Sequence, residues 1–130
     1  MISVKATREG LVGQITATGW RIDGEYPFVA LPSHKALGMW VKIRNPLTGK
    51  LCCAQVLDVG PFNVNDDAYV FQAITEDDLT PGPDSVRPLA ESGKSVSGQG
   101  TNQAGIDLGE KVWGLLGMKD NTDVEWKFIG

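Results

Sequence analysis

The chain has 130 residues, of which 42% are hydrophobic and 22% are charged. These values are typical of one globular domain that buries a core, and they exclude wholesale disorder. The formal net charge is −4 and no basic tract stands out, which disfavours a general nucleic-acid-binding surface. No apolar stretch approaches the roughly 18 residues that cross a bilayer. We therefore expect a single domain over residues 1–130 with no membrane span.

The cysteine and histidine content argues against a metal centre. The only two cysteines, Cys52 and Cys53, are adjacent in the chain. Adjacent residues of a strand point to opposite faces, so we expect both thiols to be reduced rather than joined. One histidine and this pair of cysteines give no spacing that is typical of metal ligands. We predict no metal site and no cofactor.

Short apolar runs between glycines and prolines indicate a β-rich domain. Phe28 to Leu31 is one such run. Trp40 to Arg44 alternates apolar and polar residues, with the period of a half-buried strand. Asn45 to Lys50 has the Pro and Gly of a turn, and Leu51 to Leu57 then returns as the second strand of a hairpin.

The C-terminal part predicts one helix and one strand. Glu110 to Leu116 places its apolar residues on one helical face, and Gly117 follows where a left-handed residue ends a helix. Val124 to Phe128 alternates apolar and charged residues, which predicts a terminal strand with one wet face. In this strand Trp126 is expected to belong to the core.

The segment from Asp66 to Ala104 is different in character. It has little apolar periodicity and is rich in Ser, Gly, Gln and Asn towards its end. We expect a long irregular loop insertion, either a functional rim or a mobile segment. It contains four acids: Glu76, Asp77, Asp78 and Asp84. These either form a solvated face or dock a cation or a basic partner, but their spacing does not match an EF-hand loop.

Two carboxylates and one histidine are the candidates for chemistry. Asp58 ends an apolar strand just before Gly60-Pro61, so its side chain is held at a rigid and reachable strand end. The simpler interpretation is that Asp58 accepts hydrogen bonds from turn amides. Asp107 is either an acid at the start of the predicted helix or a second carboxylate beside Asp58. His34 is the one side chain that ordinarily titrates near neutral pH.

Four stretches in order resemble the rare-lipoprotein-A-like double-psi β-barrel domain, a relative of expansins and barwin-like endoglucanases. They are Thr16 to Gly19 (TATG), His34 to Leu37 (HKAL) with the strand at Val41 to Asn45, Asp58 to Phe62 (DVGPF), and Ile106 to Leu108 (IDL) before the helix. The resemblance covers most of Gly13 to Phe128 apart from the segment 66–104. It implies a mainly β fold, a six-stranded double-psi β-barrel with one or two short helices and a long irregular loop.

The resemblance also implies a groove that accepts a glycan strand of the cell wall. In active bacterial members the substrate is peptidoglycan and the reaction is lytic transglycosylation. Carried over by position, His34 and Asp58 are the implicated catalytic pair, and Asp107 matches an acid that expansins and the related endoglucanases use. The residues expected to contact substrate are Thr18, Gly19, Trp20, Phe62 and Asn63.

Two functions follow from the resemblance. The first is a glycan-cleaving enzyme with Asp58 as acid and base, and the second is a non-catalytic module on the same barrel that binds glycan or a protein partner. Val59 stands where the family commonly has Arg, so a charge beside the acid is missing. The segment Met1 to Gly10 has no apolar core of a secretory signal and no lipidation cysteine. We expect cytoplasmic synthesis, after which the protein either stays where it is made or leaves by signal-independent export or phage release, as for a phage-encoded protein, unless a leader is missing from this sequence.

Overall fold

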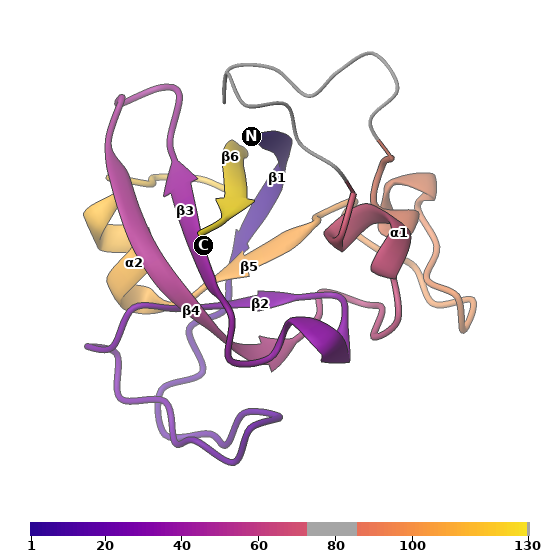
Figure 1. Cartoon of the computed structure of the whole chain (residues 1–130), viewed down its shortest axis with the longest axis horizontal. Coiled ribbons are helices and arrows are strands. Elements are labelled where there is room, and N and C mark those ends of the chain that lie inside the picture. Colours follow the sequence, from indigo (N-terminus) through magenta and orange to yellow (C-terminus); the bar gives the residue numbers. More distant parts are fainter. Residues whose placement is uncertain (73–85, 130) are drawn as a thin grey trace.

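Six strands close into a barrel in the computed structural model, which describes residues 1–72 and 86–129 (Figure 1). The strands are β1 (Ile2–Arg8), β2 (Phe28–Leu31), β3 (Trp40–Arg44), β4 (Leu51–Val59), β5 (Ile106–Leu108) and β6 (Asp123–Phe128). Their order around the barrel is β1-β5-β2-β4-β3-β6. The pairs β1–β5 and β2–β4 are parallel and the others are antiparallel. The fold is therefore mainly β and six-stranded, as the resemblance implied.

The helices are short and lie outside the barrel wall. They are α1 (Asp67–Val70), α2 (Glu110–Leu115) and the 3-10 turns η1 (His34–Ala36) and η2 (Leu89–Ser92). The predicted C-terminal helix is confirmed as α2, and Gly117 after it has a left-handed φ of 64°. None of the described helices is long and apolar enough to span a membrane. The acids Glu76, Asp77, Asp78 and Asp84 lie outside the described residues.

The predicted hairpin and terminal strand are confirmed, with changed boundaries. Asn45 and Lys50 close the turn between β3 and β4 through a backbone hydrogen bond of 3.0 Å. β4 continues two residues beyond Leu57, so Asp58 is its second-last residue and Val59 its last. Both cysteines of β4 are free thiols.

Of the two interpretations of Asp107, the acid at the helix terminus is ruled out. Asp107 is the central residue of β5, and Gly109 precedes the first turn of α2. The acid of that first turn is Glu110, which pairs with Arg8 at 2.6 Å. Because three residues are too few to show a strand period, β5 could not be distinguished from the start of the helix by pattern alone.

The core lies inside the barrel and follows strand alternation. Val29 and Leu31 of β2 and their neighbours Ile106 and Leu108 of β5 are fully buried members of one hydrophobic cluster. Trp126 also belongs to it, as predicted, and its indole N–H donates to the hydroxyl of Tyr69 on α1 at 2.9 Å. This hydrogen bond satisfies the one polar atom of a buried indole. The residues between these core positions consequently face outwards.

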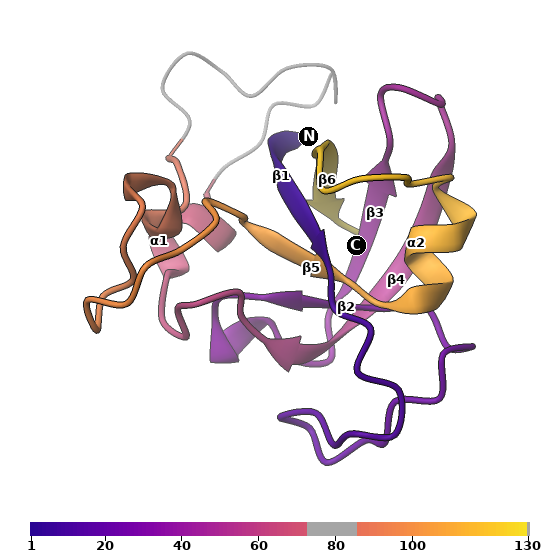
Figure 2. The same ribbon diagram turned by 180° about the vertical axis from the view of Figure 1, so that it is seen from behind.

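A long loop over residues 9–27 joins β1 to β2 and lies outside the barrel (Figures 1 and 2). A bridge between Ile15 and Arg21 and a hydrogen bond of 2.6 Å from the Arg21 guanidinium to the Gly13 carbonyl hold it together. Its Trp20 packs on Phe28 of β2, with ring centroids 5.1 Å apart. The loop thus covers part of the outer face of β2.

Candidate functional site

A β-bulge decides where Asp58 points. Alternate residues of a regular strand share a face, so Asp58 would face the core together with Val56. The pairing between β2 and β4 is irregular at this point. Val29 pairs with Val56, but the next residue of β2, Ala30, pairs with Asp58. Leu57 is therefore the extra residue of β4. The bulge therefore turns Asp58 to the outer face of the barrel.

Asp107 reaches the same place from the other side of β2. Ala30 pairs with Asp107 of β5, and Asp107 in turn pairs with Thr7 of β1. Four neighbouring residues on four strands thus form one outward row: Thr7, Asp107, Ala30 and Asp58. Ala30 itself is buried and carries only a methyl group, and the two half-buried carboxylates lie on either side of it. The structure brings together the two acids that the sequence singled out.

A third acid, Glu9, joins this row although the sequence did not single it out. Glu9 follows β1 two residues after Thr7 and therefore lies on the same face. Burial raises the pKa of Glu9 to about 9, and a hydrogen bond with Asp58 and the charges of Asp58 and Asp107 add to this effect. No described group donates to its buried Oε2 atom. This environment favours the protonated form of Glu9 at neutral pH, next to Asp58.

Asp107 is also shifted towards the protonated form. Burial raises the pKa of Asp107 to about 6, the Thr7 hydroxyl that donates to its Oδ1 lowers it, and the charge of Asp58 raises it. A Cβ atom placed on Gly60 would lie 3.7 Å from Asp107 Oδ2, so the turn after Asp58 borders this carboxylate. The row therefore holds acids whose environments keep protons on some of them near neutral pH.

The backbone of loop 9–27 holds the Asp58 side chain in place. Asp58 Oδ1 accepts hydrogen bonds of 2.9 Å from the N–H of Ala17 in this loop and from the N–H of Val59 in β4. The hydroxyl of Thr18 donates to the Leu57 carbonyl at 2.9 Å, so the stretch that carries Thr18 and Gly19 rests on the bulge. Asp58 thus accepts hydrogen bonds from backbone amides, as the simpler interpretation held. It also lies close to two other acids, Glu9 and Asp107.

His34 is not brought to these acids. It lies exposed on η1, and its backbone N–H donates to the Val64 carbonyl at 3.0 Å. Within residues 1–72 and 86–129, no hydrogen bond or ion pair joins its ring to Glu9, Asp58 or Asp107. His34 lies instead beside the irregular segment that follows the Gly60-Pro61 turn.

A cleft lies next to this turn. It has a volume of about 480 Å³ and is lined by Phe62, Asn63, Val64, Asn65, Val96 and Ser97. Phe62 is exposed, whereas Asn63 is buried and its Oδ1 accepts the Val96 N–H at 2.9 Å. Of the five expected substrate contacts, these two line the cleft, and the other three lie on loop 9–27.

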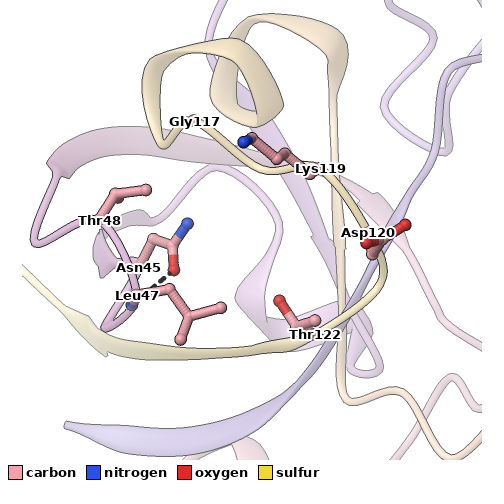
Figure 3. A pocket seen from close by; sticks show the side chains of 7 residues that line it. All are labelled: Asn45, Leu47, Thr48, Gly117, Lys119, Asp120 and Thr122. Atoms are coloured by element: carbon pink, nitrogen blue, oxygen red, sulfur yellow. Dashed lines mark hydrogen bonds between the residues drawn. The ribbon is translucent and has the colours of Figure 1, made fainter.

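The polar side chains of a second pocket have a structural role. It measures about 310 Å³ and is lined by residues of the β3–β4 turn and of the segment after α2 (Figure 3). The side chains of Asn45 and Thr48 donate to the Leu116 carbonyl at 3.0 and 2.9 Å. They satisfy a carbonyl that the end of α2 leaves without a helical partner. The polar groups here fasten the hairpin to the helix. In the described part of the chain, no cluster of three His, Cys, Asp or Glu residues has the arrangement of a metal site.

Comparisons with solved structures identify the type of barrel. The chain is similar to the Streptomyces papain inhibitor, with a TM-score of 0.52 and 15% identity over 99% of this chain and 94% of that one. It is also similar to cerato-platanin 3 from M. perniciosa, with a TM-score of 0.55 and 12% identity over 99% of this chain and 95% of that one. Both are double-psi β-barrel relatives, which confirms the expected fold type. No curated protein matches the chain.

A comparison with family models places the sequence itself. The model described as "Domain of unknown function (DUF8814)" matches residues 1–127, which is nearly the whole chain. The protein therefore belongs to the family of that description, with the fold of a double-psi β-barrel.

Proposed function

We propose that the protein cleaves a cell-wall glycan strand by lytic transglycosylation at the row formed by Glu9, Asp58 and Asp107. The observation that carries this proposal is the meeting of three carboxyl groups on one outer face, two of them with a raised pKa. Such a group can hold a proton at neutral pH and release it to a substrate. The resemblance of the motifs to rare-lipoprotein-A-like domains supports peptidoglycan as the substrate.

The chemistry needs one proton to leave and one to return. Asp58 takes a proton from Glu9 or Asp107 and gives it to the glycosidic oxygen while the bond from that oxygen to the anomeric carbon breaks. The oxygen departs as a hydroxyl group. A hydroxyl of the same sugar then attacks the anomeric carbon, and its proton passes to the Asp58 carboxylate. An anhydro ring closes, no water is consumed, and the acids regain their original protons.

The predicted substrate contacts lie on two segments. Thr18, Gly19 and Trp20 lie on the loop that rests on the bulge, and Phe62 and Asn63 line the cleft beyond Gly60-Pro61. His34 borders the cleft through its hydrogen bond to Val64. In this proposal His34 orients the glycan, while the three acids handle the proton.

A second function has its own support. The loop 9–27 exposes the aliphatic side chains of Leu11, Val12 and Ile15. Exposed apolar residues on a loop held by backbone bridges are typical of a surface that contacts another protein. One structural neighbour is described as a papain inhibitor. The alternative is therefore a non-catalytic module that binds a protein partner.

One experiment separates these functions. Purified peptidoglycan is incubated with the protein, the released fragments are analysed by mass spectrometry, and the protein retained on the insoluble material is measured. Anhydro-sugar products support the enzyme. Retention without such products indicates a glycan-binding module. Neither products nor retention would overturn both glycan functions and leave the protein-binding module.

A further inference from the structure

Three aromatic rings form a continuous surface, which we call the aromatic strip: Trp20, Tyr26 and Trp40. The ring centroids of Trp20 and Tyr26 are 5.7 Å apart, and those of Tyr26 and Trp40 are 6.4 Å apart. Tyr26 is 37% exposed and Trp40 is 40% exposed, while Trp20 is half-buried. Two of the three rings therefore keep ring surface that is accessible to a ligand.

The aromatic strip lies on the same outer face as the acids. Gln55 of β4 pairs with Phe28 of β2 and with Trp40 of β3. Residues adjacent to these three, such as Val29, belong to the core, so the row faces outwards. Phe28 precedes Ala30 by two residues. The row of Phe28, Gln55 and Trp40 therefore lies roughly 7 Å along the strand from the acid row, which is the row that holds Glu9, Asp58 and Asp107. The bulge at Leu57 is what puts both rows on one face.

Polar groups hold the middle ring in place. The Tyr26 hydroxyl donates to Gln55 Oε1 at 2.7 Å, and Gln55 Nε2 donates to the Gly38 carbonyl at 3.1 Å. The ring is therefore fixed before any ligand arrives, which lowers the entropy cost of binding. Accessible rings bordered by amide and hydroxyl groups suit a ligand with C–H faces and hydroxyl edges. A pyranose ring has that character, and an apolar peptide does not.

We propose that the aromatic strip binds the sugar rings that lie next to the bond being cleaved. This inference rests on the proposed glycan function and extends it to the residues that select the strand. The strip and the acids are adjacent, because Phe28 and Ala30 are two residues apart on β2 and loop 9–27 contributes both Trp20 and the Ala17 amide that holds Asp58. Stacking on Tyr26 and Trp40 then fixes the sugar ring relative to the carboxyl groups.

The test measures binding without cleavage. In an Asp58→Asn parent, retention on insoluble peptidoglycan is compared with that of the parent carrying Trp40→Ala, Trp40→Phe or Phe71→Ala. Phe71 is a matched control, because it is also 40% exposed but stacks on Phe128 outside the aromatic strip. We expect Trp40→Ala to weaken retention roughly 3- to 10-fold, the size of a lost ring contact. Trp40→Phe and Phe71→Ala should stay close to the parent.

The outcomes separate the two proposals. If Trp40→Ala binds as well as the parent, the aromatic strip is not the platform, and the cleavage proposal stands. If Trp40→Phe loses as much retention as Trp40→Ala, a stacked ring is not what the site needs, and the platform is again overturned. If the parent is not retained and the wild-type protein releases no products, the glycan function itself has failed. Thermal unfolding of each variant, within a few degrees of the parent, shows that the fold is intact.

Discussion

Asp58 and Asp107 pair with the same residue, Ala30, from opposite sides of β2. One pairing is parallel and the other antiparallel, so backbone ladders set the relative position of the two residues, and the Ala17 N–H of loop 9–27 then holds the Asp58 carboxylate. A site built on strands is held more rigidly than one built on loop tips. This geometry depends on the bulge at Leu57, without which Asp58 would face the core.

Thr7→Val is expected to change the pH dependence of cleavage. The Thr7 hydroxyl lowers the pKa of Asp107, which lies at about 6. If the protonated form of Asp107 supplies the proton, activity falls as the pH rises through this value. Without the hydroxyl the pKa rises, and the fall in activity moves to higher pH. The measurement is the rate of anhydro-product release from about pH 4 to about pH 9, a range that brackets both protonation states of Asp107.

Thr122→Val serves as the control for this shift. Thr122 lines the pocket near the β3–β4 turn and does not contact the acid row. Its substitution should leave the pH profile unchanged. A Thr7→Val profile that stays in place, or that moves to lower pH, contradicts the role given to Asp107.

Glu9→Gln is expected to stabilise the protein above acidic pH. The folded state keeps the Glu9 proton until its pKa of about 9, whereas the unfolded chain releases it near its ordinary value of about 4.3. Between these values the unfolded state binds fewer protons, so stability falls as the pH rises. The slope is at most that of one proton, about 1.4 kcal/mol per pH unit. Glutamine cannot ionise, so the variant loses this slope.

Denaturant unfolding from mildly acidic to alkaline pH measures the effect. The matched variant is Glu25→Gln, because Glu25 is an exposed acid on the same loop. It should keep the wild-type slope. Parallel stability curves for the wild type and Glu9→Gln would show that Glu9 is ionised in the folded protein, which contradicts its raised pKa.

Two glycine substitutions should act in opposite directions. A Cβ atom on Gly109 would lie 2.4 Å from Phe28 Cε1 and 3.0 Å from the Phe28 carbonyl oxygen. Gly109→Ala therefore forces β2 and the α2 terminus apart and should cost about 1–3 kcal/mol. Gly114, inside α2, has no atom within 4 Å of such a Cβ. Gly114→Ala should stabilise by about 0.5–1 kcal/mol, and thermal unfolding of both variants checks the contrast.

Local pattern was sufficient for the regular parts of the fold. The alternation in Trp40 to Arg44 and Val124 to Phe128 corresponds to β3 and β6, and the helical face ending at Gly117 corresponds to α2. These elements have one wet face and one buried face, and this contrast is what periodicity records. The motif around Asp58 also located one member of the acid row.

The remainder depends on contacts between distant segments. Glu9 carries no motif, and it becomes an unusual acid only because β1 and β4 bring it to Asp58. The bulge at Leu57 arises from the pairing of β4 with β2, so the sequence of β4 alone does not reveal it. The strand that carries Asp107 was not predicted, because β5 is only three residues long. His34 matches a motif, yet the fold places it beside the cleft.

The most direct measurement is the rate at which Asp58→Asn releases anhydro-sugar products from peptidoglycan, compared with the wild type and with Asp120→Asn. Asparagine retains an oxygen that accepts the Ala17 N–H, so the loop contact is preserved. Asp120 is an exposed acid outside the acid row. Loss of acid and base catalysis should lower the rate at least about 100-fold in Asp58→Asn, with Asp120→Asn unchanged. Equal product release by Asp58→Asn and the wild type would contradict the assignment of the chemistry to this row.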